Sequence, residues 1–279
     1  YGSPVKSYLY TLNTGYHRLK STCKTTYQSS DSIVEKSVFA YDTERPYNII
    51  SKSSLCSGGA EQVERTYYSN NTIPDKESLT TSQRSAIQLL TSRNYLTTPV
   101  QQTMEKKDKR LYSVLRGYSS SLSSGMVVED QYYCKGTDKY EKRISYNKYD
   151  IYGNPVYINK DGAEKVVYLW GYKGQYLLAE IKGATYEEVK KALMVDPASM
   201  SSCILPSMPL YLDMIDNLYK ALPSALITSY TYHPLIGVSG IISPNKAKTT
   251  FEYNSDSQLI RIKDTEGKTM EEYQYHFRP

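Results

Sequence analysis

Histidines are the side chains best suited to moving protons near neutral pH, and this chain has three of them. His17, His233 and His276 lie far apart, and none belongs to a motif such as HExxH or GxSxG. No glycine-rich phosphate-binding loop is present either. A hydrolytic site needs a nucleophile, a base and a group that orients the base. The sequence therefore predicts a protein that is not an enzyme.

Carboxylates could support glycoside hydrolysis, because a glycosidase needs only two of them about 5–9 Å apart. Among the 29 acidic residues, Asp150, Asp161, Asp256 and Asp264 stand where the sequence predicts turns. Aspartate in a turn usually bonds its own backbone, and no loop has the alternating aspartate spacing of a calcium site. A glycoside hydrolase is therefore the weaker alternative, and no metal or cofactor is expected.

Three aromatic residues form the best candidate binding surface. Trp170, Tyr172 and Tyr176 follow one another beside Gly171 and Gly174, where small residues leave rings accessible. An exposed aromatic platform with neighbouring polar groups suits a sugar, so a carbohydrate-binding surface centred on Trp170 is the alternative function, with a glycan as partner. The competing interpretation is that this single tryptophan anchors a helical segment to a sheet.

The cysteines limit the kind of site that the chain can build. Four of them lie tens of residues apart with no CxxC pair, which excludes a zinc ribbon. An even number permits disulfides in an oxidising compartment, whereas buried free thiols are the favoured interpretation. These residues are Cys23, Cys56, Cys134 and Cys203.

Composition indicates β-structure and argues against both a dedicated nucleic-acid binder and a membrane-spanning helix. The chain of 279 residues has 30 Tyr against 3 Phe and 1 Trp, and tyrosine favours pleated, half-solvated surfaces. Its 34 basic and 29 acidic residues give a net charge of only +5, which is far from that of a dedicated nucleic-acid binder. No apolar run reaches the ~18 residues of a membrane-spanning helix.

Alternation of apolar and polar residues predicts the strands that position these side chains. Short period-two segments occur along most of the chain, with residues 159–162 and 265–267 as clear hairpin turns. This pattern is typical of an antiparallel meander.

Residues 184–224 break the alternation and predict a two-helix insertion. The capping box at residues 185–188 begins the first helix, and an apolar face ending before Pro223 marks the second. A shorter helix is expected at about residues 81–93.

A repeat of about 20 residues runs through the later part of the chain, which indicates one hairpin per repeat. Tyr230, Phe251 and Tyr273 begin similar aromatic-x-Tyr strands at steps of 21 and 22 residues. A Tyr-Asp pair followed by a Gly-Asn turn appears in YDIYGNPV at residues 149–156, and Asn254 replaces the aspartate in a second copy.

These features resemble the RHS/YD-repeat family of large bacterial secreted and cell-surface proteins. The resemblance covers residues 142–193 and 227–279, whereas residues 1–141 are interpreted as degenerate repeats of the same sheet. It rests on YDIYGNPV together with VYLWGY at residues 167–172, YTYHPLIG at residues 230–237 and YQYHFRP at residues 273–279.

The resemblance implies a mainly β fold, in which antiparallel hairpins form an extended sheet that curls into a partial shell or barrel. One continuous unit is expected, cut from a longer protein. It comprises a β-repeat region over residues 1–183, the helical insertion over residues 184–224 and YD-type repeats over residues 225–279. The implied function is a scaffold, or part of a shell around a C-terminal effector domain, outside a bacterial cell or on its surface. Asp196-Pro197 is the only Asp-Pro pair and lacks the following Gly-Leu of self-cleaving relatives, so autocleavage is not expected.

Overall fold

The described residues fold into one antiparallel sheet of 16 strands that follow one another in sequence order. The computed structural model describes residues 17–276, except residues 29–30, 56–58, 124 and 203–207. The strands are β1 (Ser21–Gln28), β2 (Asp31–Tyr41), β3 (Ile49–Leu55), β4 (Glu61–Tyr68), β5 (Pro99–Lys106), β6 (Lys109–Ser119), β7 (Val127–Lys135), β8 (Glu141–Tyr149), β9 (Pro155–Lys160), β10 (Glu164–Gly171), β11 (Tyr176–Lys182), β12 (Leu226–His233), β13 (Gly237–Ile242), β14 (Lys248–Tyr253), β15 (Leu259–Lys263) and β16 (Thr269–Glu272).

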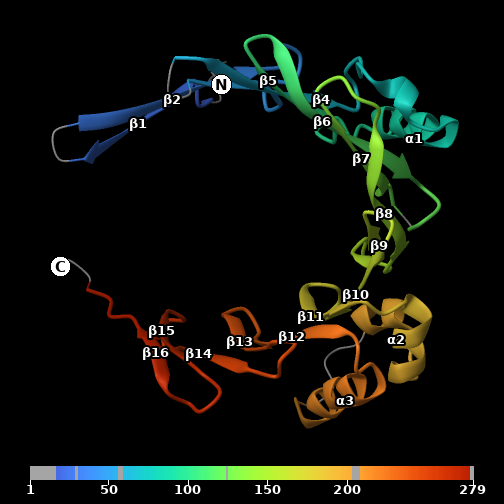
Figure 1. The fold of residues 1–279 in the computed structure, drawn as a ribbon, viewed down its shortest axis with the longest axis vertical. Helices are drawn as coiled ribbons and strands as arrows, with labels where there is room; N and C mark the ends of the chain where they lie inside the picture. The colour runs from blue at the N-terminus through green and yellow to red at the C-terminus, as the bar shows by residue number, and fades with distance from the viewer. Residues whose placement is uncertain (1–16, 29–30, 56–58, 124, 203–207, 277–279) are drawn as a thin grey trace, which may run out of the picture.

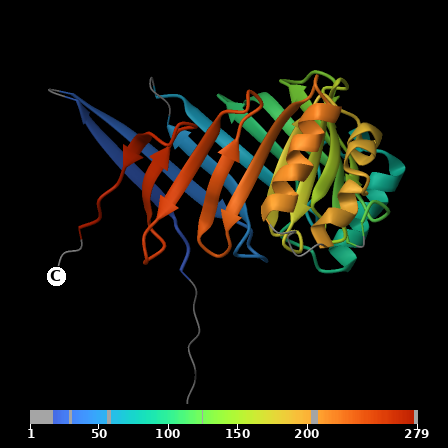
Figure 2. The same cartoon turned by 90° about the horizontal axis from the view of Figure 1, so that it is seen from below.

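The sheet curls into an open arc, which confirms the predicted fold class. Strands β1 and β16 are the two edges, and they face each other across the opening instead of pairing (Figure 1). Figure 2 shows the strands side by side along the strip, with the helices gathered at the right-hand end of the view. The helices are α1 (Thr81–Ser92), α2 (Tyr186–Leu193) and α3 (Met208–Ala221), with short 3-10 turns η1 (Lys76–Ser78) and η2 (Pro197–Ser202).

One hydrogen bond recurs in every hairpin and defines the repeat. At or just beyond the end of each even-numbered strand, an aromatic side chain donates to a backbone carbonyl at the start of the preceding strand, over 2.5 to 3.0 Å. We call these residues the strand-end aromatics. The bonds join Tyr41 to Leu19, Tyr68 to Ile49, Tyr118 to Pro99, Tyr149 to Val128, Trp170 to Pro155, Tyr232 to Leu177, Tyr253 to Val238 and Tyr275 to Leu259.

The same positions explain why the sheet curls. Every strand-end aromatic except Tyr275 coincides with a shift in strand register. A bulge inserts an unpaired residue, so it bends its strand and increases the local twist. Repeated once in each hairpin along the strip, this distortion turns a flat meander into an arc.

The residue after the strand-end aromatic closes the turn. The carboxylate oxygen Oδ1 of Asp42 and that of Asp150 each accept two backbone N–H groups of their own turn, and the amide oxygen of Asn254 does the same. Such side-chain bonds replace backbone partners that a tight turn leaves unpaired. In the Tyr-Asp pair of the sequence, the tyrosine thus makes the recurring hydrogen bond and the aspartate caps the turn that follows.

The helices cover the convex side of the arc, and the main cores lie beneath them (Figure 1). Capping boxes begin both α1, at Thr80, and α2, at Thr185, as the spacing of residues 185–188 predicts. Helix α1 buries Ala86, Ile87 and Leu90 against Val100, Leu115 and Tyr132. Helices α2 and α3 bury Val189, Ile215 and Leu218 against Val167, Leu169, Ile181 and Ile227.

The cysteines differ in burial. Cys134 is buried, but Cys23 is exposed, so the interpretation as buried thiols is wrong for Cys23. Cys23 lies on β1, an edge strand against which none of the described helices packs, and this leaves its side chain open to solvent. Cys56 and Cys203 lie outside the described residues. Within the described part of the chain, no helix has the length and apolar character needed to cross a membrane.

Candidate functional site

Strand alternation assigns side chains to the two faces of the sheet. Val167 and Leu169 pack beneath the helices, so Tyr168 between them points to the concave side. Its neighbour Val166 pairs with Ile158, and Ile158 pairs with Tyr146, so these residues share the concave face. None of the described helices covers that face (Figure 1).

Half-buried tyrosines run along the concave face. Tyr133 follows Tyr132, which packs under α1, and it stacks on Tyr112 with ring centres 6.0 Å apart. Tyr230 follows Ser229, whose partner Ala179 lies in the helix-covered core. We call the set of Tyr112, Tyr133, Tyr146, Tyr168 and Tyr230 the concave tyrosine row.

Three tyrosines of the concave tyrosine row have a raised pKa. Burial raises the pKa of Tyr168 to about 12, and burial also raises the pKa of Tyr146 and of Tyr230. The charged neighbours Glu180 and Lys182 form an ion pair of 3.3 Å. The face offers aromatic surface and hydroxyl groups, and the Arg143 guanidinium lies over the Tyr133 ring at 5.8 Å.

The structure separates the three aromatics that the sequence places together. Tyr172 and Tyr176 meet edge to face at 4.9 Å, and Tyr176 also contacts Tyr232 at 4.6 Å. Trp170 is half-buried, and its indole Nε1 donates to the Pro155 carbonyl at 2.8 Å. The ring contacts found among the described residues do not include Trp170. Sugar binding at Trp170, Tyr172 and Tyr176 stays a prediction.

Two of the turn aspartates use their carboxylates in local contacts. Asp150 is buried and uses its carboxylate within its own turn, where it accepts from two backbone N–H groups and from the Asn154 amide. Asp161 pairs with Arg143 at 2.9 Å. Among the described residues, no three His, Cys, Asp or Glu side chains are grouped closely enough to hold a metal ion.

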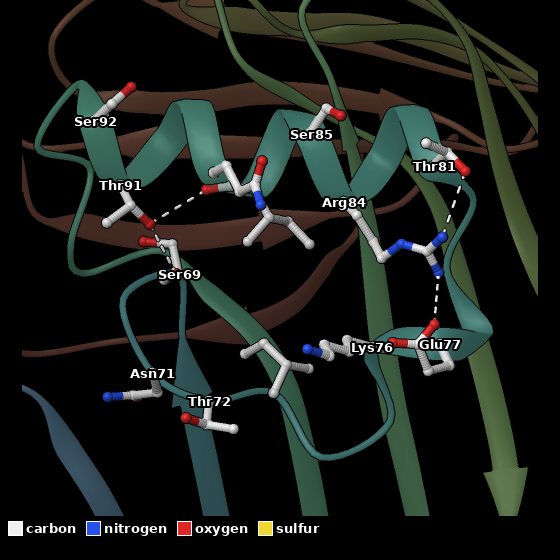
Figure 3. A pocket seen from close by; sticks show the side chains of 13 residues that line it. Ser69, Asn71, Thr72, Lys76, Glu77, Thr81, Arg84, Ser85, Thr91 and Ser92 are labelled. Atoms are coloured by element: carbon white, nitrogen blue, oxygen red, sulfur yellow. Dashed lines mark hydrogen bonds and ion pairs between the residues drawn. The ribbon is translucent and has the colours of Figure 1, made fainter.

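A pocket of about 770 Å³ opens on the convex face. It lies between α1 and the segment that follows β4, with Thr72 and Lys76 on one side and Ser85 and Thr91 on the other (Figure 3). The sequence analysis missed both this pocket and the concave tyrosine row. The alternation of Tyr168 between two aliphatic residues is a signal that could have revealed the row, whereas the pocket has no local signature.

Comparison with known proteins gives only remote similarity. No family model matches the sequence, and no curated protein matches it either. Among solved structures, the chain is similar to the TcdB2–TccC3–Cdc42 structure, with 11% identity over 82% of this chain and a TM-score of 0.33. It is also similar to a Photorhabdus luminescens Tc holotoxin pore, with 11% identity over 82% of this chain and a TM-score of 0.34.

A third solved structure, TcdB2–TccC3 without its hypervariable C-terminal region, has 9% identity over 83% of this chain and a TM-score of 0.33. The matches cover only 12% of the first two solved chains and 14% of the third. This chain therefore spans a small part of the length of the chains that it is similar to.

Proposed function

We propose that this chain is a non-enzymatic wall segment of a larger shell, and that its concave face is turned toward a polypeptide cargo. The observation that carries the proposal is the one-sided placement of the helices. Helices α1, α2 and α3 lie on the convex face, where they bury aliphatic side chains, and within the described part of the chain no helix covers the concave row of half-buried tyrosines.

The chemistry of the concave face suits a polypeptide of varied sequence. Tyrosine rings supply apolar contact area at low conformational cost, and their hydroxyl groups bond to backbone or side chains. Because burial holds the pKa of Tyr146 and Tyr168 above the ordinary value, these two side chains stay neutral. Neutral side chains repel neither acidic nor basic segments of a cargo.

The two open edges of the sheet support the proposal that this chain is a segment of a longer sheet. Edge strands expose unpaired N–H and C=O groups, and β1 and β16 both end the sheet in this way. Further hairpins of the same repeat would pair with these edges and extend the arc. The resemblance of the sequence to YD-repeat proteins suggests a C-terminal effector domain of the parent chain as cargo, in an extracellular or cell-surface setting in bacteria.

Limited proteolysis of the full parent chain, followed by intact-mass analysis under native conditions, tests the proposal. We expect a discrete C-terminal fragment that stays associated with the shell after cleavage. Tyr112→Asp places a charge in the concave row and is expected to release the fragment. The matched control is Tyr152→Asp, at an exposed tyrosine of the turn between β8 and β9, which should leave the fragment bound.

Two results would overturn the proposal. One is a parent chain that yields no associated fragment, and the other is equal retention in the concave and control variants. Circular dichroism of both variants establishes that they are folded, so that release reports on the concave face and not on collapse of the sheet.

A further inference from the structure

The convex pocket belongs to an insertion and not to the hairpin repeat. Its walls come from residues between β4 and β5, where α1 and η1 interrupt the meander. Its volume of about 770 Å³ lies in the range of small-molecule sites, roughly 300–1,000 Å³. Loops added to a rigid scaffold are where binding residues concentrate, so this insertion is a natural place for a ligand.

Hydrogen bonds hold both walls of the pocket in place. Thr91 Oγ1 donates to the Ser69 carbonyl at 2.8 Å (Figure 3). Ser69 Oγ in turn donates to the Tyr95 carbonyl at 2.7 Å. At the other end, Arg84 Nη1 donates to Glu77 and to the Leu79 carbonyl, each at 3.1 Å. The pocket is therefore preformed, and a ligand would not have to order its walls.

The lining combines an apolar base with polar groups at the opening. Ile73 and Ile87 are 6% and 8% exposed, and they offer aliphatic surface to a ligand. Thr72, Ser85 and Gln88 are exposed and present hydroxyl and amide groups. A small ring with C–H faces and several hydroxyl groups, as in a monosaccharide, matches both parts of this lining.

The charges of the lining restrict the class of ligand further. Two cations line the pocket, and one of them, Arg84, is neutralised by Glu77 at 3.1 Å. For the other, Lys76, no carboxylate of the described residues lies within ion-pair distance. In Figure 3 the Lys76 side chain extends between α1 and Thr72. Its ammonium group is thus available to an anionic group of the ligand.

We infer that this pocket binds an acidic monosaccharide unit, with the sugar carboxylate on Lys76 and the ring over Ile73 and Ile87. Glu77 is the one carboxylate among the described residues that line the pocket, and Arg84 holds it. Glycoside hydrolysis uses a pair of carboxylates, so the site binds the sugar without cleaving it. The site lies on the convex face and is independent of the proposed cargo-facing role.

Ligand-observed NMR with the whole chain tests this inference, using D-glucuronate as the probe and D-glucose as its neutral counterpart. We expect glucuronate to bind in the millimolar range and glucose to bind more weakly. Lys76→Gln should weaken glucuronate binding by about tenfold and leave glucose binding unchanged. Lys191→Gln, which removes an exposed lysine of α2, is the matched control and should bind as the wild type does.

Ser85→Trp places a large ring at an exposed position that lines the pocket, and it should abolish binding of both sugars. Any of three results would overturn the inference. They are the absence of glucuronate binding, equal glucuronate affinity in Lys76→Gln and the wild type, and unchanged binding in Ser85→Trp. Thermal melting of each variant establishes that the fold is intact before binding is compared.

Discussion

Trp170 takes the place that tyrosine occupies in the other hairpins. Its indole N–H bonds the carbonyl of Pro155 at the start of β9, as Tyr149 bonds Val128 in the hairpin before it. The residue type differs, but the donor reaches the same kind of acceptor. A role in anchoring the hairpin therefore accounts for the single tryptophan without any ligand.

A pair of substitutions separates the hydrogen bond of Trp170 from its bulk. Trp170→Phe keeps an aromatic ring but loses the donor, so we expect a loss of about 1 kcal/mol in the free energy of unfolding. Trp170→Tyr restores a donor and should recover most of that loss. Urea unfolding followed by circular dichroism measures both. Equal stability of the two variants would contradict the anchoring role.

Tyr118 gives the molecule a dependence on alkaline pH. It is 5% exposed, and burial raises its pKa from 10.0 to about 12. The unfolded chain loses this proton first, so the stabilisation is fully present below pH 10 and is lost as the pH rises to about 12. Two pKa units correspond to at most about 3 kcal/mol.

We therefore expect the urea midpoint to fall between pH 10 and pH 12, and to fall less steeply in Tyr118→Phe. A series of urea titrations at constant ionic strength provides the comparison. Parallel pH dependence in the two proteins would show that Tyr118 does not contribute. The lost bond to Pro99 lowers the stability of the variant at every pH, so the slopes are compared and not the absolute values.

At the scale of elements, α1 contacts the sheet through a buried amide as well as through its apolar face. Gln83 is 1% exposed, and its Nε2 donates to Glu129 and Asp130 at 3.0 Å while its Oε1 accepts from Tyr132. Gly117 of β6 lies directly beneath this group. The absence of a side chain there lets the helix approach the strand.

Gly117→Ala tests that close approach. The added Cβ would lie 2.3 Å from Gln83 Cδ, and the buried bonds of Gln83 leave it little freedom to move. We expect a loss of about 1–3 kcal/mol in the free energy of unfolding. Gly125→Ala, where a Cβ meets nothing within 4 Å, should change stability little. Equal effects of the two substitutions in thermal melts would contradict the packing described here.

At the scale of the whole molecule, buried apolar side chains are concentrated in the middle of the arc. Strands β10 and β11 lie beneath α2 and α3, and their aliphatic residues other than Leu177 are almost wholly buried. At the two ends, the residues of β16 and those described on β1 are exposed. We therefore expect the free energy of local opening to be highest in the middle of the sheet and lowest at its ends, because opening costs least where little apolar surface is buried.

Hydrogen–deuterium exchange with mass spectrometry measures that gradient. We expect amides of β10 and β11 to exchange slowest and those of β1 and β16 to exchange fastest. In a longer parent chain whose hairpins extend the sheet, the amides of both edge strands should become protected. Uniform protection across all sixteen strands in the isolated chain would contradict a middle stabilised by its helices.

Features that depend on near neighbours in the chain could be predicted from the sequence. Tyrosine content and alternation predicted the antiparallel meander, the residues at 185–188 predicted the start of α2, and the Tyr-Asp repeat predicted the hairpin turns. Caps and turns use bonds between residues a few positions apart, so their spacing is visible in the chain.

Three features depended on the tertiary structure: which face of the sheet is concave, which carbonyl accepts the hydrogen bond of Trp170, and where a pocket opens. Alternation shows that Val167 and Leu169 share a face, but the helices over them, distant in sequence, determine that this face is convex. Similarly, the bond of Trp170 to Pro155 depends on strand register, and the pocket depends on how α1 packs against the segment after β4. These features arise from contacts between segments that folding brings together, and no local pattern of residues encodes them.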